Sequence, residues 1–432
     1  MTTAVPSPLA AIGPLTNLEA ILILAVLVLV FMIWQLIHHQ ECHYTDVAPT
    51  AIDESLQALA GSTHGHLTNG NTVSLIQNEA YFDAVIDAIS QAKRSVHFET
   101  FLWADGEASE RVIAALIAAV GRGITVRILT DASGSRGLSS ASADRLRSAG
   151  CEFHRFHRYR LENFGRFNVR DHRKILIIDG RIAIVGGHCV TDNWLKDGKQ
   201  LSRIRDISAW ISGPAVTAIQ SCFLENWTEG TGDLFTDDST FPIVEDTGTT
   251  KVHTAYVKAD DCPSSVQVLH QLAIGYAKKR IRIQNPYFLP DPHSARALAN
   301  AAKRGVDVRI MIPALTATDS PYITRAGRFQ FQRLLDGGVR IFEYQKTLLH
   351  QKVISIDGVW CGIGSSNFDD RSFEINEEIT VGVADPAIVA ELERIFEDDA
   401  KDCKEIDPQT WPKRPWFTRA TDAFLYLFNE QF

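Results

Sequence analysis

One long apolar run lies near the start of the chain. Residues Ala20–Trp34 are all apolar, and the stretch from Leu18 to Ile37 carries a single charge, Glu19. About 20 apolar residues are enough for a helix to cross a bilayer. A cleaved signal peptide would need a basic start and a small-x-small cleavage site, which this stretch lacks. The pattern predicts a retained single-pass transmembrane helix over residues 17–39, after an N-terminal tail of residues 1–16.

Beyond that run, the pattern of apolar positions repeats. Residues 94–131 and 279–313 each read as a short strand, an amphipathic helix, an Arg-Gly pair and a second apolar strand. This order predicts a parallel strand pair with a right-handed crossover. Gly123 and Gly305 stand where a helix C-terminal cap is expected. Each half then ends in two apolar strands joined by an Asp-Gly turn, which predicts a hairpin.

The repeat predicts how the chain is organised. We expect an α/β fold with two similar lobes, after the transmembrane helix. A polar linker is expected over residues 40–75, the first lobe over residues 76–245 and the second lobe over residues 246–405. Residues 406–432 form an aromatic, amphipathic C-terminal segment, whose pattern suits packing on a bilayer and packing on the protein equally well.

Composition narrows the class of protein. The 432 residues carry a formal net charge of −9, whereas a general nucleic-acid binder is usually basic, so that class is disfavoured. The seven cysteines are scattered and include no Cys-x-x-Cys pair. Free thiols in a reducing compartment are therefore favoured over a disulfide framework or a zinc site.

The pattern His-x-Lys-x-x-x-x-Asp occurs twice, in DHRKILIIDG and in LHQKVISIDG. The two copies consist of His172, Lys174 and Asp179, and of His350, Lys352 and Asp357. Residues i and i+2 of a strand share a face, so the histidine and the lysine of each copy point the same way. Each aspartate directly precedes a glycine, so a structural role in the turn is favoured over a direct chemical role.

Two imidazoles and two ammonium groups suit chemistry at a phosphodiester. Lysines neutralise the non-bridging oxygens and stabilise the charge of the transition state. A neutral imidazole attacks phosphorus and gives a phosphohistidine, while a protonated imidazole donates a proton to the leaving alkoxide. The residues alone leave open which histidine takes which role.

The paired motif resembles that of the phospholipase D superfamily, and most of all its bacterial cardiolipin synthases, over about Asn78–Ala400. The resemblance implies two lobes whose motifs meet in one active site, without a metal or cofactor. It also implies that His172 is the nucleophile and His350 the acid and base. The further implied positions are Asp206 and Glu377, which would orient the motif histidines, and Ser365 and Asn367, which would contact phosphate.

The first half departs from the family pattern in GGHCVTDNW, where Cys189 stands in place of the usual asparagine. This change removes one amide donor and makes the site asymmetric. A packed structural thiol is favoured over a reactive cysteine at this position.

The substrate class follows from the surroundings of the motif. Residues 154–174 interleave arginines with aromatic residues, which suits anionic lipid head groups, although single-stranded nucleic acid or a solvated loop would also fit. Together with the paired motif and the predicted anchor, the resemblance implies a phosphatidyltransferase in the cell (inner) membrane, with a cytoplasmic catalytic part and phospholipid substrates. It would make cardiolipin from phosphatidylglycerol or a related donor. The alternatives are hydrolysis to phosphatidic acid, an HKD nuclease and a non-catalytic lipid-binding protein.

Overall fold

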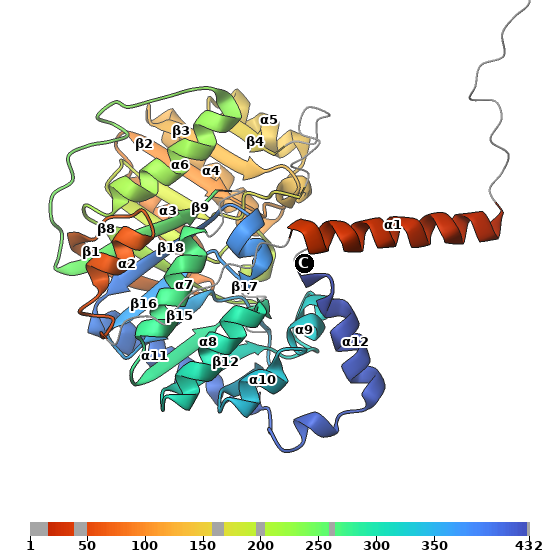
Figure 1. Cartoon of the computed structure of the whole chain (residues 1–432). Coiled ribbons are helices and arrows are strands. Elements are labelled where there is room, and N and C mark those ends of the chain that lie inside the picture. The colour runs from red at the N-terminus through yellow and green to blue at the C-terminus, as the bar shows by residue number, and fades with distance from the viewer. Residues whose placement is uncertain (1–15, 39–49, 158–167, 196–203, 259–263, 430–432) are drawn as a thin grey trace, which may run out of the picture. The chain divides into compact units, whose positions relative to one another are not determined.

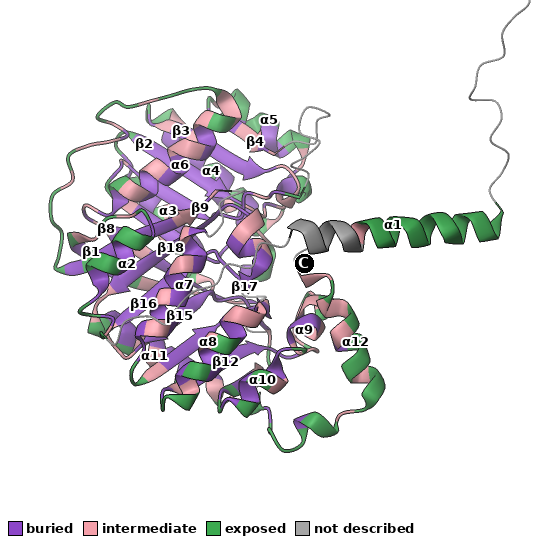
Figure 2. Cartoon of the chain, viewed as in Figure 1, coloured by how far each residue is buried: buried purple, intermediate pink, exposed green. Residues whose placement is uncertain are grey.

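The computed structural model describes residues 16–38, 50–157, 168–195, 204–258 and 264–429 (Figure 1). The chain divides into two compact units, residues 1–43 and residues 44–432. The described part of the first unit is the helix α1 (Asn17–His38), along which the large apolar side chains of residues 18–30 are exposed (Figure 2). Among the described residues, no helix is both long enough and apolar enough to cross a membrane.

The second unit is built on one sheet with two similar halves, 15-stranded in the part of the chain that the structure describes. Across the first half the order is β4 (Glu152–Phe156), β3 (Thr125–Asp131), β2 (Ser95–Thr100), β5 (Ile175–Ile178), β6 (Ile182–Gly186), β8 (Ile207–Ser212) and β1 (Thr68–Gln77). The second half continues with β9 (Thr250–Val257), β18 (Glu378–Ala384), β16 (Trp360–Gly364), β15 (Val353–Ile356), β10 (Arg280–Gln284), β12 (Asp307–Pro313), β13 (Arg340–Tyr344) and β19 (Cys403–Glu405). The antiparallel pair β1 and β9 joins the halves.

The predicted repeat is confirmed. Strands β2 and β3 pair in parallel, as do β10 and β12, and the helices α4 (Glu107–Gly121) and α8 (Pro292–Lys303) make the crossovers. Gly123 (φ +83°) and Gly305 (φ +96°) follow these helices in the left-handed conformation that a C-terminal cap favours. Both predicted hairpins are present, as β5 with β6 and as β15 with β16.

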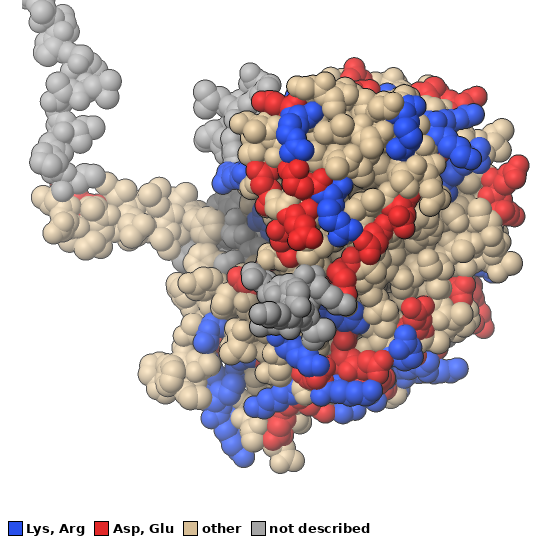
Figure 3. All heavy atoms as spheres, turned by 180° about the vertical axis from the view of Figure 1, so that it is seen from behind, with Lys and Arg blue, Asp and Glu red and all other residues tan. Residues whose placement is uncertain are grey.

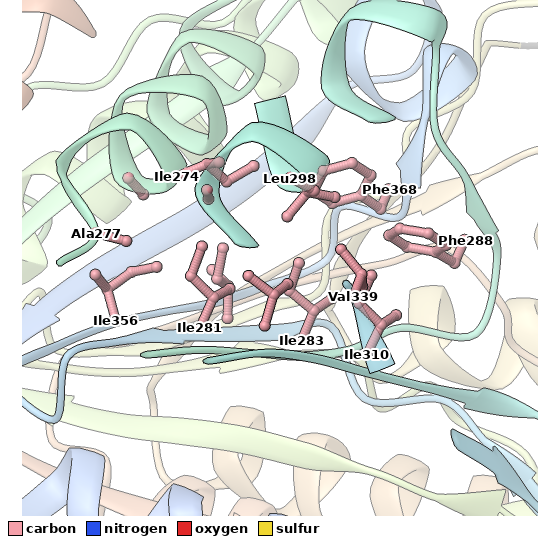
Figure 4. Packing of buried hydrophobic residues seen from close by; sticks show 14 of the residues in the cluster. Ile274, Ala277, Ile281, Ile283, Phe288, Leu298, Ile310, Val339, Ile356 and Phe368 are labelled. Carbon is pink, nitrogen blue, oxygen red and sulfur yellow. The ribbon is translucent and has the colours of Figure 1, made fainter. Parts of the chain in front are cut away.

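Helices cover both faces of each half. In the first half α3 (Ala80–Gln91), α4 and α5 (Ser140–Ser148) share a core with Leu176 and Ile178 of β5, while α6 (Val216–Thr231) shares a core with Ile175 and Ile177. The second half repeats this arrangement with α7 (Ser265–Tyr276), α8, α10 (Phe331–Asp336) and α11 (Pro386–Ala400). Figure 4 shows Ile274 and Leu298 packed over Ile281 and Ile283. Strands buried on both faces read as continuous apolar runs, as KILII does.

The prediction of a polar linker over residues 40–75 is wrong for residues 50–75. The short helix α2 (Leu56–Ser62) buries Leu56 and Leu59 in the core of the second half, and β1 begins at Thr68. The strand is polar in sequence because Asn71, fully buried, donates to the Thr250 carbonyl oxygen and accepts from the Ala215 N–H. Long-range pairing of this kind has no local sequence pattern. Residues 40–49 lie outside the described residues.

Candidate active site

Each motif histidine is fixed by the backbone of the opposite half. The strand β14 (Leu348–Leu349) pairs in parallel with β7 (Ile204–Arg205), and the His350 N–H donates to the Arg205 carbonyl oxygen at 2.8 Å. The His172 N–H donates in the same way to the Glu377 carbonyl oxygen at 3.0 Å, beside a parallel bridge between Asp171 and Glu377. The two motifs are therefore brought together at the junction of the halves.

The predicted contact between Asp206 and a motif histidine is present. Asp206 follows β7, and its Oδ2 accepts from His350 Nδ1 at 2.8 Å and from Trp194 Nε1 at 3.0 Å. Room for this carboxylate comes from Gly187, where a Cβ atom would lie 2.3 Å from Asp206 Oδ1. Burial alone would raise the pKa of Asp206, but His188, His350 and nearby Lys352 lower it to about 2. Asp206 is thus ionised at neutral pH and is placed to stabilise a protonated His350.

The prediction that Glu377 orients a motif histidine is wrong, because the neighbouring residue makes the contact. His172 Nδ1 donates to Glu378 Oε1 at 2.8 Å. Successive side chains of an extended strand point to opposite sides, so the Glu377 carboxylate instead accepts from Asn226 Nδ2 at 2.9 Å. Aligning Asp206-Ile207-Ser208 of the first half with Glu378-Ile379-Thr380 of the second half places Glu378, and not Glu377, opposite Asp206.

Glu378 differs from Asp206 in its electrostatic state. Burial raises the pKa of Glu378 to about 8, although Lys174 and a hydrogen bond from Ser365 oppose this rise. The group is therefore mostly protonated at neutral pH, and the two histidines have unlike partners. The Ser365 hydroxyl is engaged by this carboxyl group. Contact of Ser365 and of the buried Asn367 with phosphate remains a prediction.

Both motif lysines are buried beside their histidines. Lys174 Nζ donates to the His172 carbonyl oxygen, and Lys352 Nζ donates to the His350 carbonyl oxygen at 2.8 Å and lies 3.0 Å from His350 Nε2. Burial lowers the pKa of both lysines, that of Lys352 to about 7. A bound anion would raise these pKa values again, because it favours the charged ammonium form. The two lysines therefore become more fully protonated, and the site more positive, when an anionic group enters.

The same cations act on the imidazoles. Burial lowers the pKa of His172 well below its usual value, and Lys174 and Lys352 lower it further. Burial and Lys352 also lower the pKa of His350, but here Asp206 opposes them. The aromatic ring of Phe101 stands edge-on to His172 at 4.9 Å between ring centres. His172 is consequently held neutral, in the state in which an imidazole is a nucleophile.

The motif aspartates act in the backbone, as the favoured interpretation predicted, and a direct chemical role for them is wrong. Asp179 (φ +54°) and Asp357 (φ +55°) adopt the left-handed conformation of the turn. Each carboxylate accepts three backbone N–H groups at the start of the neighbouring strand, from residues 93–95 and 278–280 respectively. Each aspartate stands seven positions after its histidine, which at about 3.3 Å per residue in an extended strand separates the two by up to roughly 23 Å.

Cys189 is buried in the apolar core beside the first motif, and burial raises the pKa of its thiol. This environment is that of a packed thiol, because a reactive cysteine needs a lowered pKa. The described cysteines, Cys151, Cys189, Cys222, Cys361 and Cys403, are free. Within the described ranges, no cluster of three or more His, Cys, Asp or Glu residues could hold a metal ion. Residues 158–167, the centre of the arginine and aromatic stretch, lie outside the described residues.

Comparison with known proteins identifies the family. A family model described as a cardiolipin synthase, PLD-like domain, matches residues 85–227 and 272–400. A cardiolipin synthase of Staphylococcus aureus is 34% identical over 380 residues, which cover 87% of this chain and 76% of the relative. One of Geobacillus kaustophilus is 33% identical over 361 residues, which cover 83% and 72%. The crystal structure of a phosphatidylserine synthase from Haemophilus influenzae shares the fold, with a TM-score of 0.66 at 12% identity over 82% of this chain and 92% of that chain. The chain belongs to the cardiolipin synthase family of phospholipase D-like proteins.

Proposed function

We propose that this protein is a phosphatidyltransferase that makes cardiolipin and glycerol from two molecules of phosphatidylglycerol. The observation that carries the proposal is the pair of buried His-Lys sets at one junction, each backed by a different carboxyl group. Membership of the cardiolipin synthase family supports the lipid substrate. A related phospholipid donor would use the same site in the same way.

In the first half-reaction, neutral His172 attacks the phosphorus of the donor through Nε2. A P–N bond forms, the P–O bond to the glycerol head group breaks, and protonated His350 gives its proton to the leaving alkoxide. The product is a phosphatidyl-histidine and free glycerol. Lys174 and Lys352, one from each half, lie where they would balance the negative charge of the phosphoryl oxygens.

In the second half-reaction, His350 takes a proton from the head-group hydroxyl of a second phosphatidylglycerol. That oxygen attacks phosphorus, the P–N bond breaks, and cardiolipin leaves neutral His172 and protonated His350 behind. Both histidines thus return to their starting states. If water replaced the lipid hydroxyl, the product would be phosphatidic acid.

The assignment of the two roles rests on the unlike carboxyl groups. A cycle of this kind needs an imidazolium at the leaving group and a neutral imidazole at phosphorus. Burial and Lys352 lower the pKa of His350, but ionised Asp206 opposes this and makes His350 the easier of the two histidines to protonate, whereas a mostly protonated Glu378 gives no such advantage to His172. This difference supports His172 as the nucleophile and His350 as the acid and base.

The apolar run supports a membrane location. We propose that the apolar run of residues 17–39 anchors the protein in the cell membrane as a single pass, with the catalytic body on the cytoplasmic side. Residues Ala20–Trp34 are apolar without interruption, and the tail before them contains no Lys or Arg to oppose its translocation. Alkaline extraction of membranes tests the anchor, since release of the full chain would contradict it. Protease treatment of intact spheroplasts tests the orientation, because a catalytic body on the cytoplasmic side should be protected from digestion.

The activity is tested with the full-length protein reconstituted in phosphatidylglycerol vesicles. We expect cardiolipin and glycerol in equal amounts, and loss of both in His172→Ala and His350→Ala. The exposed His66 serves as the control, and His66→Ala should keep full turnover. Phosphatidic acid in place of cardiolipin would mean hydrolysis. Undiminished turnover in both motif variants would refute the mechanism.

A further inference from the structure

The helix α12 (Trp416–Tyr426) holds to the body through polar contacts and through the ring of Tyr426, which packs on the ring of Phe329 at 4.7 Å between ring centres. It packs on α9 (Pro321–Gly327), and Tyr426 Oη accepts from Gln330 Nε2 at 2.8 Å and donates to the Pro290 carbonyl oxygen at 3.1 Å. Asp422, turned inward and buried, accepts from Arg414 Nη1 at 2.8 Å. Most of the apolar side chains of α12 therefore take no part in its contacts with the body.

Those apolar side chains point outward. Trp416, Phe417, Phe424 and Leu427 are 79%, 59%, 59% and 62% exposed. At 100° per residue they fall in one stripe roughly 100° wide along the helix. Single exposed apolar residues are common on proteins, but a continuous stripe with three large aromatic rings marks an interaction surface.

The charges around the stripe select its partner. Lys413 and Arg419 are exposed beside it, while Asp422, the acidic residue of the described helix, is buried and paired with Arg414. The stripe is thus bordered by positive charge on a protein whose formal net charge is −9. On the face drawn in Figure 3, acidic and basic side chains of the body are instead interspersed. A second copy docked on the stripe about a two-fold axis would bring like charges together.

A series of direct contacts links α12 to the active site. Asn429, just beyond α12, donates from Nδ2 to Asp370 Oδ2 at 2.6 Å, and Asp370 lies three residues after Asn367. In addition, α9 contacts β11 (Phe288–Leu289), which pairs in parallel with β17 (Phe368–Asp369). In Figure 1, α12 and α9 lie on the same side of the body as β17. These contacts tie α12 to the segment that carries Ser365 and Asn367.

We propose that the outward stripe of α12, bordered by Lys413 and Arg419, docks on an anionic phospholipid bilayer and sets the active site against the lipid head groups. Aromatic and aliphatic side chains enter the interface, and the flanking bases meet the lipid phosphates. This inference rests on the proposed function, because it supplies lipid substrates to that same site. It adds a second membrane contact, made by the catalytic body itself.

The first test places the helix by fluorescence. The full-length protein is reconstituted in phosphatidylglycerol vesicles with acyl chains brominated near the head group. The contribution of Trp416 is the difference between the wild type and Trp416→Phe. We expect bromine to quench that contribution by more than half. An unquenched Trp416 in a protein that makes cardiolipin would overturn the docking while leaving the proposed function intact.

The second test measures catalysis. The triple substitution Phe417→Ser, Phe424→Ser and Leu427→Ser should raise the KM for phosphatidylglycerol in vesicles at least about tenfold, because three apolar insertions are lost. Its kcat on a water-soluble short-chain phosphatidylglycerol should stay at the wild-type value. The matched control is Leu234→Ser with Ile243→Ser, two exposed apolar residues elsewhere, which should change neither value. An unchanged KM, or loss of a dimer in the triple variant, would overturn the docking. Absence of turnover on both substrates in the wild type would instead refute the proposed function.

Discussion

The carboxyl groups that contact the two histidines differ in charge, because Asp206 is ionised and Glu378 is mostly protonated. Replacing each by an amide of the same shape should therefore lower the reaction rate by different factors. In Asp206→Asn the side chain keeps its size, and its carbonyl oxygen still accepts from Trp194 and His350. What disappears is the negative charge, together with the hydrogen bond that Oδ1 accepts from the Ile207 N–H, because an amide NH2 group cannot accept it. In Glu378→Gln little charge disappears at neutral pH, because burial already keeps that carboxyl group mostly protonated.

The magnitude follows from the pKa values. The surroundings of Asp206, despite its burial, hold its pKa at about 2 against an ordinary 3.8. At 1.36 kcal/mol per pKa unit, they favour the ionised form by about 2–3 kcal/mol. If the protonated His350 of the transition state loses an interaction of this size, the rate falls by roughly two orders of magnitude. For Glu378→Gln at pH 7 we expect a loss of less than about tenfold, because a protonated carboxyl group and an amide each have one acceptor and one donor side.

The assay is cardiolipin formation by the full-length protein at saturating phosphatidylglycerol, pH 7, with the glycerol burst measured separately. Asp206→Asn should lower the burst rate, because proton donation by His350 belongs to the first half-reaction. Thermal unfolding of both variants controls for misfolding. Equal losses in the two variants, or a larger loss in Glu378→Gln, would refute the assignment of His350 as the acid and base.

Three further predictions test separate parts of the account. In urea unfolding, Asp179→Ala should lower the unfolding free energy by about 2 kcal/mol or more, because three backbone N–H groups lose their acceptor. Asp179→Asn should lower the unfolding free energy by less, because asparagine tolerates the left-handed turn. Burial raises the pKa of Glu99 to about 7, so the unfolded chain releases this proton near pH 4.5 and the folded chain only near pH 7, and the stability of the wild type should fall between these two pH values. Glu99→Gln, which copies Gln284 of the second half, should abolish up to about 3 kcal/mol of that fall, as measured by urea titrations at pH 5 and pH 8. Because burial lowers the pKa of Lys352 to about 7, inorganic phosphate should bind more tightly below pH 7 than above it in calorimetric titrations, and Lys352→Met should remove most of this dependence.

Local periodicity carried most of the fold prediction. The crossover helix α4 and the hairpin after Lys174 follow from spacings within a few residues, and the structure confirms both. The shared face of His172 and Lys174 likewise follows from strand geometry alone. What local patterns miss is pairing between distant segments. β1 reads as a polar linker because Thr250 and Ala215, which tie Asn71 to the rest of the sheet and to the loop before α6, lie more than a hundred residues away.

The site shows the same limit at finer scale. Two adjacent glutamates lie at the start of β18, Glu377 just before it and Glu378 as its first residue, and a shift of one residue exchanges the side that faces His172 for the side that faces Asn226. Strand parity over such a short stretch depends on the bridge to Asp171, which belongs to the other half. The pairing of Asp206 with His350 is also made across the junction, so neither half alone contains a complete histidine–carboxylate pair.

The central claim is that phosphorus passes through a covalent bond to His172. Rapid acid-free quenching of the wild-type protein with phosphatidylglycerol, followed by mass spectrometry of its peptides, measures this bond directly. A phosphatidyl adduct on His172 that forms before cardiolipin appears, and that is absent from His172→Ala, is the predicted result. An adduct on His350 alone, or cardiolipin formation by His172→Ala at the wild-type rate, would contradict the account.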